Sequence, residues 1–116
     1  MADLLRFETI LTIVRKEVMQ EIKLHTLQVF IAVANAEEPI DSVKLMKRVG
    51  LDQRTLNRDT TVLALRMIKD ADGAHKRVGF DLIEARPDMY ETRRLAYSLT
   101  QKGKALAEKL SRIQNK

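Results

Sequence analysis

The sequence has 116 residues, enough for one domain with a substantial hydrophobic core and too few for two. Hydrophobic residues make up 45% of it and charged residues 32%, so the chain should fold, and the absence of cysteine excludes disulfides and cysteine-ligated metals. No apolar run approaches the length of a membrane span, and the acidic Asp3 and Glu8 do not suit a signal peptide, so we expect a cytoplasmic protein without a membrane partner.

Positive charge is concentrated in the second half of the chain. The net charge is +5, and the isoelectric point calculated from the sequence is about 9.7. Residues 1–40 carry a net charge of −2, residues 41–100 carry +3 and residues 101–116 carry +4. This distribution gives the second half a modest attraction for a polyanion such as nucleic acid.

Two helices are predicted in the first forty residues. The first covers 3–21, where apolar residues recur at helical spacing and form a wide stripe with polar residues opposite. These apolar residues are Leu4, Phe7, Ile10, Leu11, Val14, Val18 and Ile22. The second covers 24–36 and should end before Pro39, which disfavours helical geometry at Glu38.

Residues 41–68 are predicted to form a helix-turn-helix. Asp41 is a suitable N-cap for the first helix, Gly50 can end it in the left-handed conformation, and Asp52 is placed to cap the second helix. The predicted core side of the second helix consists of Leu56, Thr60, Leu63 and Met67. This spacing predicts a helix that continues past Met67 toward residue 69.

The opposite side of the second helix is polar and rich in hydrogen-bond donors. It carries Gln53, Arg54, Asn57, Arg58 and Thr61. A recognition helix in the major groove reads base edges with residues near its N-terminus, where Arg can pair with guanine and Asn with adenine. An ordinary solvated helix face has the same composition. Thr55 is better explained by capping and packing, although it also lies within reach of a phosphate.

A β-hairpin is predicted after the helix-turn-helix. Residues 70–73 (Asp-Ala-Asp-Gly) are turn formers that must end the second helix, and the polar, basic residues 73–79 are predicted to form a loop. The segments 80–86 and 92–99 predict two strands joined through a turn that starts at Pro87.

A final helix completes the predicted order of elements. Thr100 is placed to cap it, and Gly103 in its first turn should weaken it slightly. Its core residues are predicted to be Leu106, Leu110 and Ile113. A helix-turn-helix followed by a hairpin is a winged helix. The sequence therefore predicts an α+β, mainly α, single domain over 1–116, with 80–99 as the wing.

Two stretches resemble the MarR family of bacterial winged-helix transcription regulators. Residues 45–56, LMKRVGLDQRTL, resemble the family's helix-turn-helix pattern. Residues 81–106 resemble its wing and the entry to its last helix, because Glu91, Thr100 and Gly103 keep the family's spacing. The segment between the recognition helix and the wing is longer than is usual in the family.

The resemblance, which spans roughly residues 24–110, implies a wing whose arginines approach the minor groove, where negative potential is concentrated. The wing candidates are Arg86, Arg93 and Arg94. Arg93 is in register with the family's wing arginine. The alternative is that these are solvated charges paired with Asp88 and Glu91. The basic residues 75–77 could touch phosphates, and we favour simple exposure.

Together these features predict a homodimer that binds double-stranded DNA sequence-specifically and regulates transcription, as a repressor on a pseudo-palindromic site. Residues 1–22 and 101–116 would be the dimerisation helices. The alternative is a winged-helix module that binds another protein, because one fold serves many functions. A basic surface over 53–61 without exposed aliphatic side chains would favour DNA, since protein-docking surfaces more often carry apolar patches.

The sequence offers no support for enzymatic chemistry. Its serines lie in no nucleophile motif, it has no glycine-rich phosphate loop, and nothing places His25 and His75 with carboxylates as a metal site. We therefore expect no catalytic residues, metal or cofactor. No feature identifies a small-molecule effector.

Overall fold

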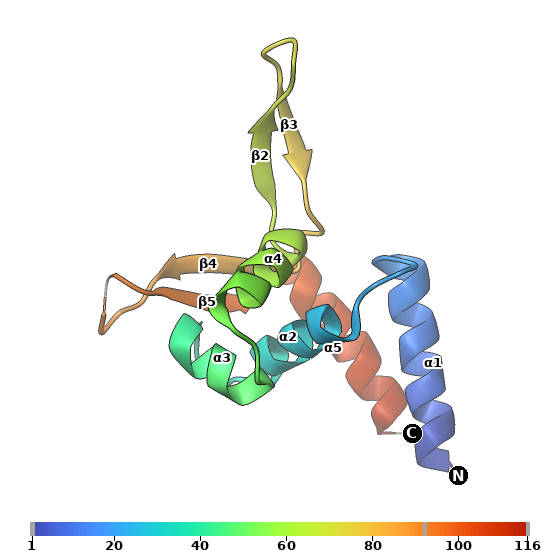
Figure 1. The fold of residues 1–116 in the computed structure, drawn as a ribbon. Helices are drawn as coiled ribbons and strands as arrows, with labels where there is room; N and C mark the ends of the chain where they lie inside the picture. Colours follow the sequence, from blue (N-terminus) through green and yellow to red (C-terminus); the bar gives the residue numbers. More distant parts are fainter. Residues whose placement is uncertain (1, 92, 116) are drawn as a thin grey trace.

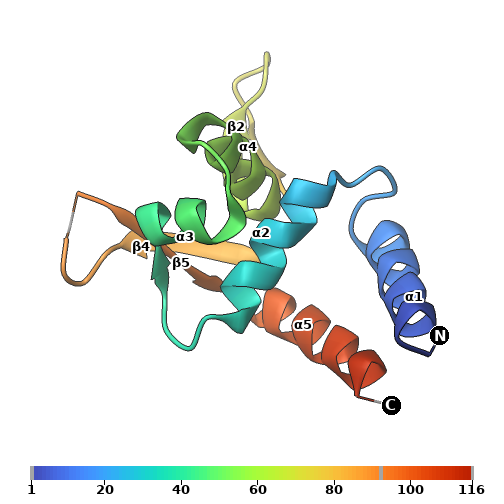
Figure 2. The ribbon, with the colours of Figure 1, turned by 60° about the horizontal axis from the view of Figure 1, so that its bottom comes forward.

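The computed structural model describes residues 2–91 and 93–115 of the chain. In chain order the elements are α1 (Ala2–Glu17), α2 (Leu24–Asn35), β1 (Ile40–Asp41), α3 (Ser42–Val49), α4 (Gln53–Leu63), β2 (Arg66–Lys69), β3 (His75–Val78), β4 (Ile83–Pro87), β5 (Leu95–Leu99) and α5 (Gln101–Gln114). Figure 1 and Figure 2 show a helical body from which two hairpins, β2–β3 and β4–β5, project in different directions.

The helices α3 and α4 and the hairpin β4–β5 form a winged helix. β5 lies between β1 and β4 in a three-stranded sheet, and both pairings are antiparallel. The register places Ile40 opposite Tyr97 and Ile83 opposite Leu99. Ile83 and Tyr97 are buried, so this sheet helps to close the core. The predicted fold class, α+β and mainly α, is confirmed.

The core is mainly aliphatic, with Phe30 and Tyr97 as its buried aromatic residues among those that the structure describes. Its largest fully buried side chains are Phe30, Leu45, Leu56, Leu63, Ile83, Val14 and Val29. The helix α2 lies at the centre, packed against α3, α4, α5 and β5. α4 therefore rests on the core along one side, and its other side faces solvent.

The predicted caps of the helix-turn-helix are confirmed. The side chain of Asp41 accepts a hydrogen bond from the N–H of Lys44 at 2.9 Å, and that of Asp52 accepts one from Thr55 at 2.8 Å. Gly50 is left-handed, with φ of 71°. These three local signals set the start of both helices and the turn between them.

The helix α4 ends at Leu63, so its predicted continuation to residue 69 is wrong. Ala64 is extended, with φ of −90° and ψ of 156°. The carbonyls of Val62 and Leu63 accept hydrogen bonds from the N–H groups of Phe80 at 3.1 Å and Leu82 at 2.8 Å. Carbonyls that a longer helix would have used are thus satisfied by a segment that returns from far along the chain.

The chain beyond α4 forms a second hairpin, the β2–β3 ribbon. Its strands pair antiparallel from Arg66 opposite Val78 to Lys69 opposite His75, so the predicted loop over 73–79 is largely a strand. The turn formers make its tip, where the carboxylate of Asp70 accepts from the N–H groups of Asp72 and Ala74 at 3.0 and 2.9 Å. Met67, predicted to face the core, is 55% exposed.

The wing differs from the prediction at both strand starts. Its first strand begins at Ile83 and not at residue 80, because Gly79 and Asp81 have positive φ values of 97° and 57° that interrupt an extended chain. Thr92, the predicted start of the second strand, lies outside the described residues, and β5 begins at Leu95.

Gly103, expected from the sequence only to weaken α5, is required by packing. A Cβ at this position would lie 1.9 Å from the carbonyl oxygen of Leu82. The predicted cap is present, because the hydroxyl of Thr100 accepts from the N–H of Gly103 at 3.0 Å and donates to the carbonyl of Asp81 at 2.5 Å. The start of α5 is therefore fastened to the start of the wing.

The helix α1 lies alongside α5 on the side of the body away from the wing (Figure 1). It ends at Glu17, earlier than predicted, and leaves Val18 and Ile22 partly buried in the following loop. Lys109 Nζ donates to Glu17 Oε2 at 2.6 Å across the two helices. Over 2–91 and 93–115, no helix is both long enough and apolar enough to cross a membrane.

Candidate nucleic-acid interface

The outer face of α4 gathers most of the predicted DNA-binding residues. Leu56, Thr60 and Leu63 are buried beneath the helix, as predicted. Gln53, Arg54, Asn57 and Arg58 are exposed on the opposite side, and Thr61 is partly exposed. This solvent-facing surface is polar and basic, and it carries no exposed aliphatic side chain between residues 53 and 61.

Thr55 is committed to the cap of α4. It is partly buried, and its N–H donates to the carboxylate of Asp52. This backbone hydrogen bond makes the largest contribution to holding the pKa of Asp52 below its usual value. A hydrogen bond from the Thr55 side chain lowers the pKa next most, and the positive charges of Arg54 and Arg58 lower it less. Asp52 is therefore ionised at neutral pH, and its stabilisation of the helix start is lost only as the pH falls through that lowered pKa.

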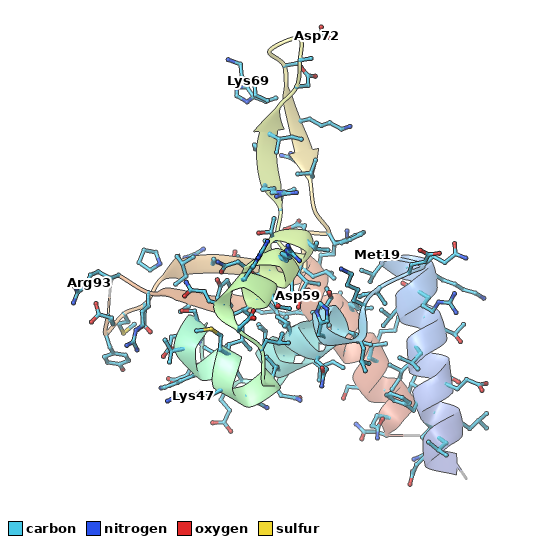
Figure 3. The ribbon with its side chains drawn as sticks, viewed as in Figure 1. Met19, Lys47, Asp59, Lys69, Asp72 and Arg93 are labelled. Carbon is cyan, nitrogen blue, oxygen red and sulfur yellow. The ribbon has the colours of Figure 1, made fainter. Side chains whose placement is uncertain are left out.

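A buried carboxylate fixes α4 to the body. Asp59 Oδ1 accepts a hydrogen bond from the hydroxyl of Thr26 at 2.6 Å, and its Oδ2 lies 2.6 Å from His25 Nδ1. Figure 3 labels Asp59 on the side of α4 that faces α2. Sequence analysis missed this contact. The sequence spacing could have indicated it, because Asp59 follows Leu56 by three residues and precedes Leu63 by four and so lies on the buried side of the helix.

A further cation lies beside the outer face of α4. Lys23, the residue before α2, lines a shallow surface depression together with residues of α4. The α4 residues in this depression are Arg54, Asn57, Arg58, Thr61 and Val62. Sequence analysis did not single out Lys23, because it lies in a connecting loop and only the packing of α2 against α4 brings it there.

The wing arginines lie on a separate projection and two of them are paired within it. Arg86 lies 3.8 Å from Glu84, and Arg93 Nε lies 3.2 Å from the carboxylate of Glu91. Arg94 is exposed and has no carboxylate within 4.0 Å among residues 2–91 and 93–115. Figure 3 shows Arg93 at the wing tip, well away from α4. The wing candidates thus form a second site and do not extend the α4 face.

Histidine and carboxylate groups do not cluster as metal ligands in the part of the chain that the structure describes. His25 meets the single carboxylate of Asp59, which is used to hold α4. His75 lies in the ribbon opposite Lys69, whose charge would oppose a bound cation.

Comparison with known proteins shows likeness in structure alone. No protein-family model and no curated protein matches the sequence. The fold is similar to that of the PcaV transcriptional regulator from Streptomyces coelicolor, with a TM-score of 0.59 and 20% identity over 97% of this chain and 74% of PcaV. RV1404 from Mycobacterium tuberculosis gives a TM-score of 0.64 with 18% identity over 94% of this chain and 64% of that protein.

A crystal structure of MarR aligns over 97% of this chain and 72% of its own, with 13% identity and a TM-score of 0.59. At these identities the likeness establishes the fold. The expected resemblance to MarR-like winged helices is confirmed at that level.

Proposed function

We propose that this protein is a sequence-specific double-stranded DNA-binding regulator of transcription. The observation that carries the proposal is the outer face of α4, where Gln53, Arg54, Asn57 and Arg58 are exposed on a helix held rigidly from beneath. Arg54 or Arg58 would pair with guanine and Asn57 with adenine in the major groove. Lys23 beside this face would contact a phosphate and position the helix.

The similar structures support the same proposal. PcaV is described as a transcriptional regulator, and this chain shares its fold over nearly all of its own length. We infer repression by occlusion, in which the bound protein prevents other proteins from binding to the same DNA site.

A homodimer would match a pseudo-palindromic site, with two recognition helices about one helical turn, roughly 34 Å, apart. Supporting this, α1 exposes Leu4, Leu5 and Phe7, and Phe7 borders an apolar groove between α1, α2 and α5. Two copies could cover these faces through an isologous interface. Leu5→Glu with Phe7→Glu should yield monomers in sedimentation.

The direct test is a selection of bound duplexes from a randomised pool with purified protein. A preferred sequence is expected, and Arg54→Ala or Asn57→Ala should lose about 1–3 kcal/mol on it and flatten the preference. Glu108→Gln, on the exposed face of α5, is the control and should leave both unchanged. Failure of the native protein to bind any duplex at low salt would contradict the proposal.

The second candidate function is docking to another protein through the wing. Its tip exposes Met89 and Tyr90, which are 85% and 88% accessible. Apolar side chains displayed in this way are more typical of a protein contact than of a phosphate contact. Met89→Ser with Tyr90→Ser should leave DNA selection intact if this tip serves a protein partner.

A further inference from the structure

The β2–β3 ribbon carries a regular arrangement of positive charge. Its four cross-strand pairs are Arg66–Val78, Met67–Arg77, Ile68–Lys76 and Lys69–His75. Each pair contains one arginine or lysine, and neither strand contains an acidic residue. Because directly opposed residues share a face of the ribbon and successive pairs alternate, each face presents two of the four cations.

These four cations are not neutralised within the molecule. None of them has a carboxylate within 4.0 Å in the described ranges, whereas Arg86 and Arg93 of the wing each have one. The two acidic residues of the hairpin, Asp70 and Asp72, lie at its tip, and the carboxylate of Asp70 is occupied by backbone N–H groups. All four basic side chains belong to exposed residues. The strands therefore offer unpaired charge to an external anion.

The ribbon is fixed to the end of the recognition helix. Only Ala64 and Leu65 separate α4 from β2. After β3, the N–H groups of residues 80 and 82 donate hydrogen bonds to the last carbonyls of α4. Figure 1 shows the ribbon rising directly from this end of α4. The four residues of β2 span about 13 Å, which equals roughly four base-pair steps along a duplex.

We propose that the β2–β3 ribbon is a second nucleic-acid-binding arm, which contacts phosphates of the duplex on which α4 sits, beyond the base pairs that α4 reads. This inference rests on the proposed function. The partner is favoured by charge complementarity, by the absence of competing carboxylates along both strands, and by continuity with the α4 face. Contacts of this kind add affinity and extend the bound length, and they carry no base preference.

Lys69, Lys76 and Arg77 are the side chains on which we base the test, because Arg66 is nearest the helix. The ribbon variant is Lys69→Gln with Lys76→Gln and Arg77→Gln. The matched control is Lys16→Gln with Lys109→Gln and Arg112→Gln, which removes the same charge from exposed positions on α1 and α5 that do not line the apolar groove of the proposed dimer interface. The control breaks two exposed ion pairs, and such pairs contribute little to stability.

The probe is a labelled duplex of mixed sequence of about 40 base pairs, titrated at several salt concentrations. The ribbon variant should bind at least tenfold more weakly than the control at low salt. Its slope of log affinity against log salt should be shallower by about two to three for each arm in contact.

Equal affinities and slopes for the ribbon and control variants, with native binding intact, would overturn the arm and leave the proposed function standing. A changed sedimentation coefficient for the ribbon variant with unchanged DNA binding would also overturn it, in favour of contact with protein through Met67 and Ile68, which are exposed on the same strands. If the native protein does not bind this duplex at low salt, the proposed function itself is wrong. Thermal unfolding of each variant separates loss of binding from loss of fold.

Discussion

The two hairpins of this molecule differ in what they bury and in how their charges are balanced. The wing β4–β5 is part of the three-stranded sheet and places Ile83, Ala96 and Tyr97 in the core, while its charged residues include as many acids as bases. The ribbon β2–β3 buries none of its strand residues and leaves four cations unpaired. A segment that contributes so little to the core and keeps its charge free is better explained by an external partner than by stability.

The largest expected effect is on the free energy of unfolding, which should depend on the wing and hardly on the ribbon. Ile83→Ala should lower the free energy of unfolding by about 3 kcal/mol, because it leaves a cavity where Ile83 is 1% exposed. Ile68→Ala, the same change on the ribbon, should stay within about 0.5 kcal/mol, because Ile68 is 42% exposed. Urea denaturation measures both. Similar losses of unfolding free energy for the two variants would show that the ribbon contributes to stability as the wing does.

A smaller effect is expected at the two ends of the ribbon. Gly79→Ala should cost about 2 kcal/mol, because its φ is 97° and a Cβ would lie 1.8 Å from the carbonyl oxygen of Ala64. Gly73→Ala, at the tip, should cost about 1 kcal/mol for its φ of 84° alone. Hydrogen exchange at Phe80 and Leu82 should accelerate in the first variant only. Unchanged exchange there would mean that the ribbon is not fixed to α4 through those hydrogen bonds.

The smallest effect tests the paired charges of the wing. Glu91→Gln would release Arg93, and DNA affinity should rise about twofold, with the salt slope steeper by less than about one. Glu108→Gln, which releases Arg112 on α5 in the same way, is the control and should change neither. Weaker binding after Glu91→Gln would indicate that Glu91 orients Arg93 toward the DNA and does not neutralise it.

Sequence reasoning succeeded where structure is set by neighbours in the chain. Asp41, Gly50, Asp52 and Thr100 were identified as caps because each acts on a backbone group within four residues. The exposed face of α4 followed from helical periodicity once its start was known. These local signals were sufficient for the fold class and for the candidate recognition residues on α4.

The sequence-based predictions were wrong or incomplete where the structure depends on contacts between residues that are distant in the sequence. A spacing of four residues between Leu63 and Met67 is typical of a helix. Residues 66–69 form a strand instead, because β2 pairs with β3 and because residues 80 and 82 donate hydrogen bonds to the end of α4. Asp59 meets Thr26 across 33 residues, and Lys23 reaches α4 only through packing. Long-range contacts of this kind leave no local pattern, and they decided where α4 ends and what lies beside it.

The buried Asp59 has a consequence for altering this protein. Its hydrogen bond to Thr26, together with the burial of Leu56 and Leu63, holds one side of α4 against the body and leaves the outward side chains in solvent. The identities at 53, 54, 57 and 58 are therefore unconstrained by the core and can be randomised together while the backbone that presents them stays in place. A combinatorial library at these four positions, with Asp59 and Thr26 held constant, would test whether the proposed DNA preference can be changed without changing the fold.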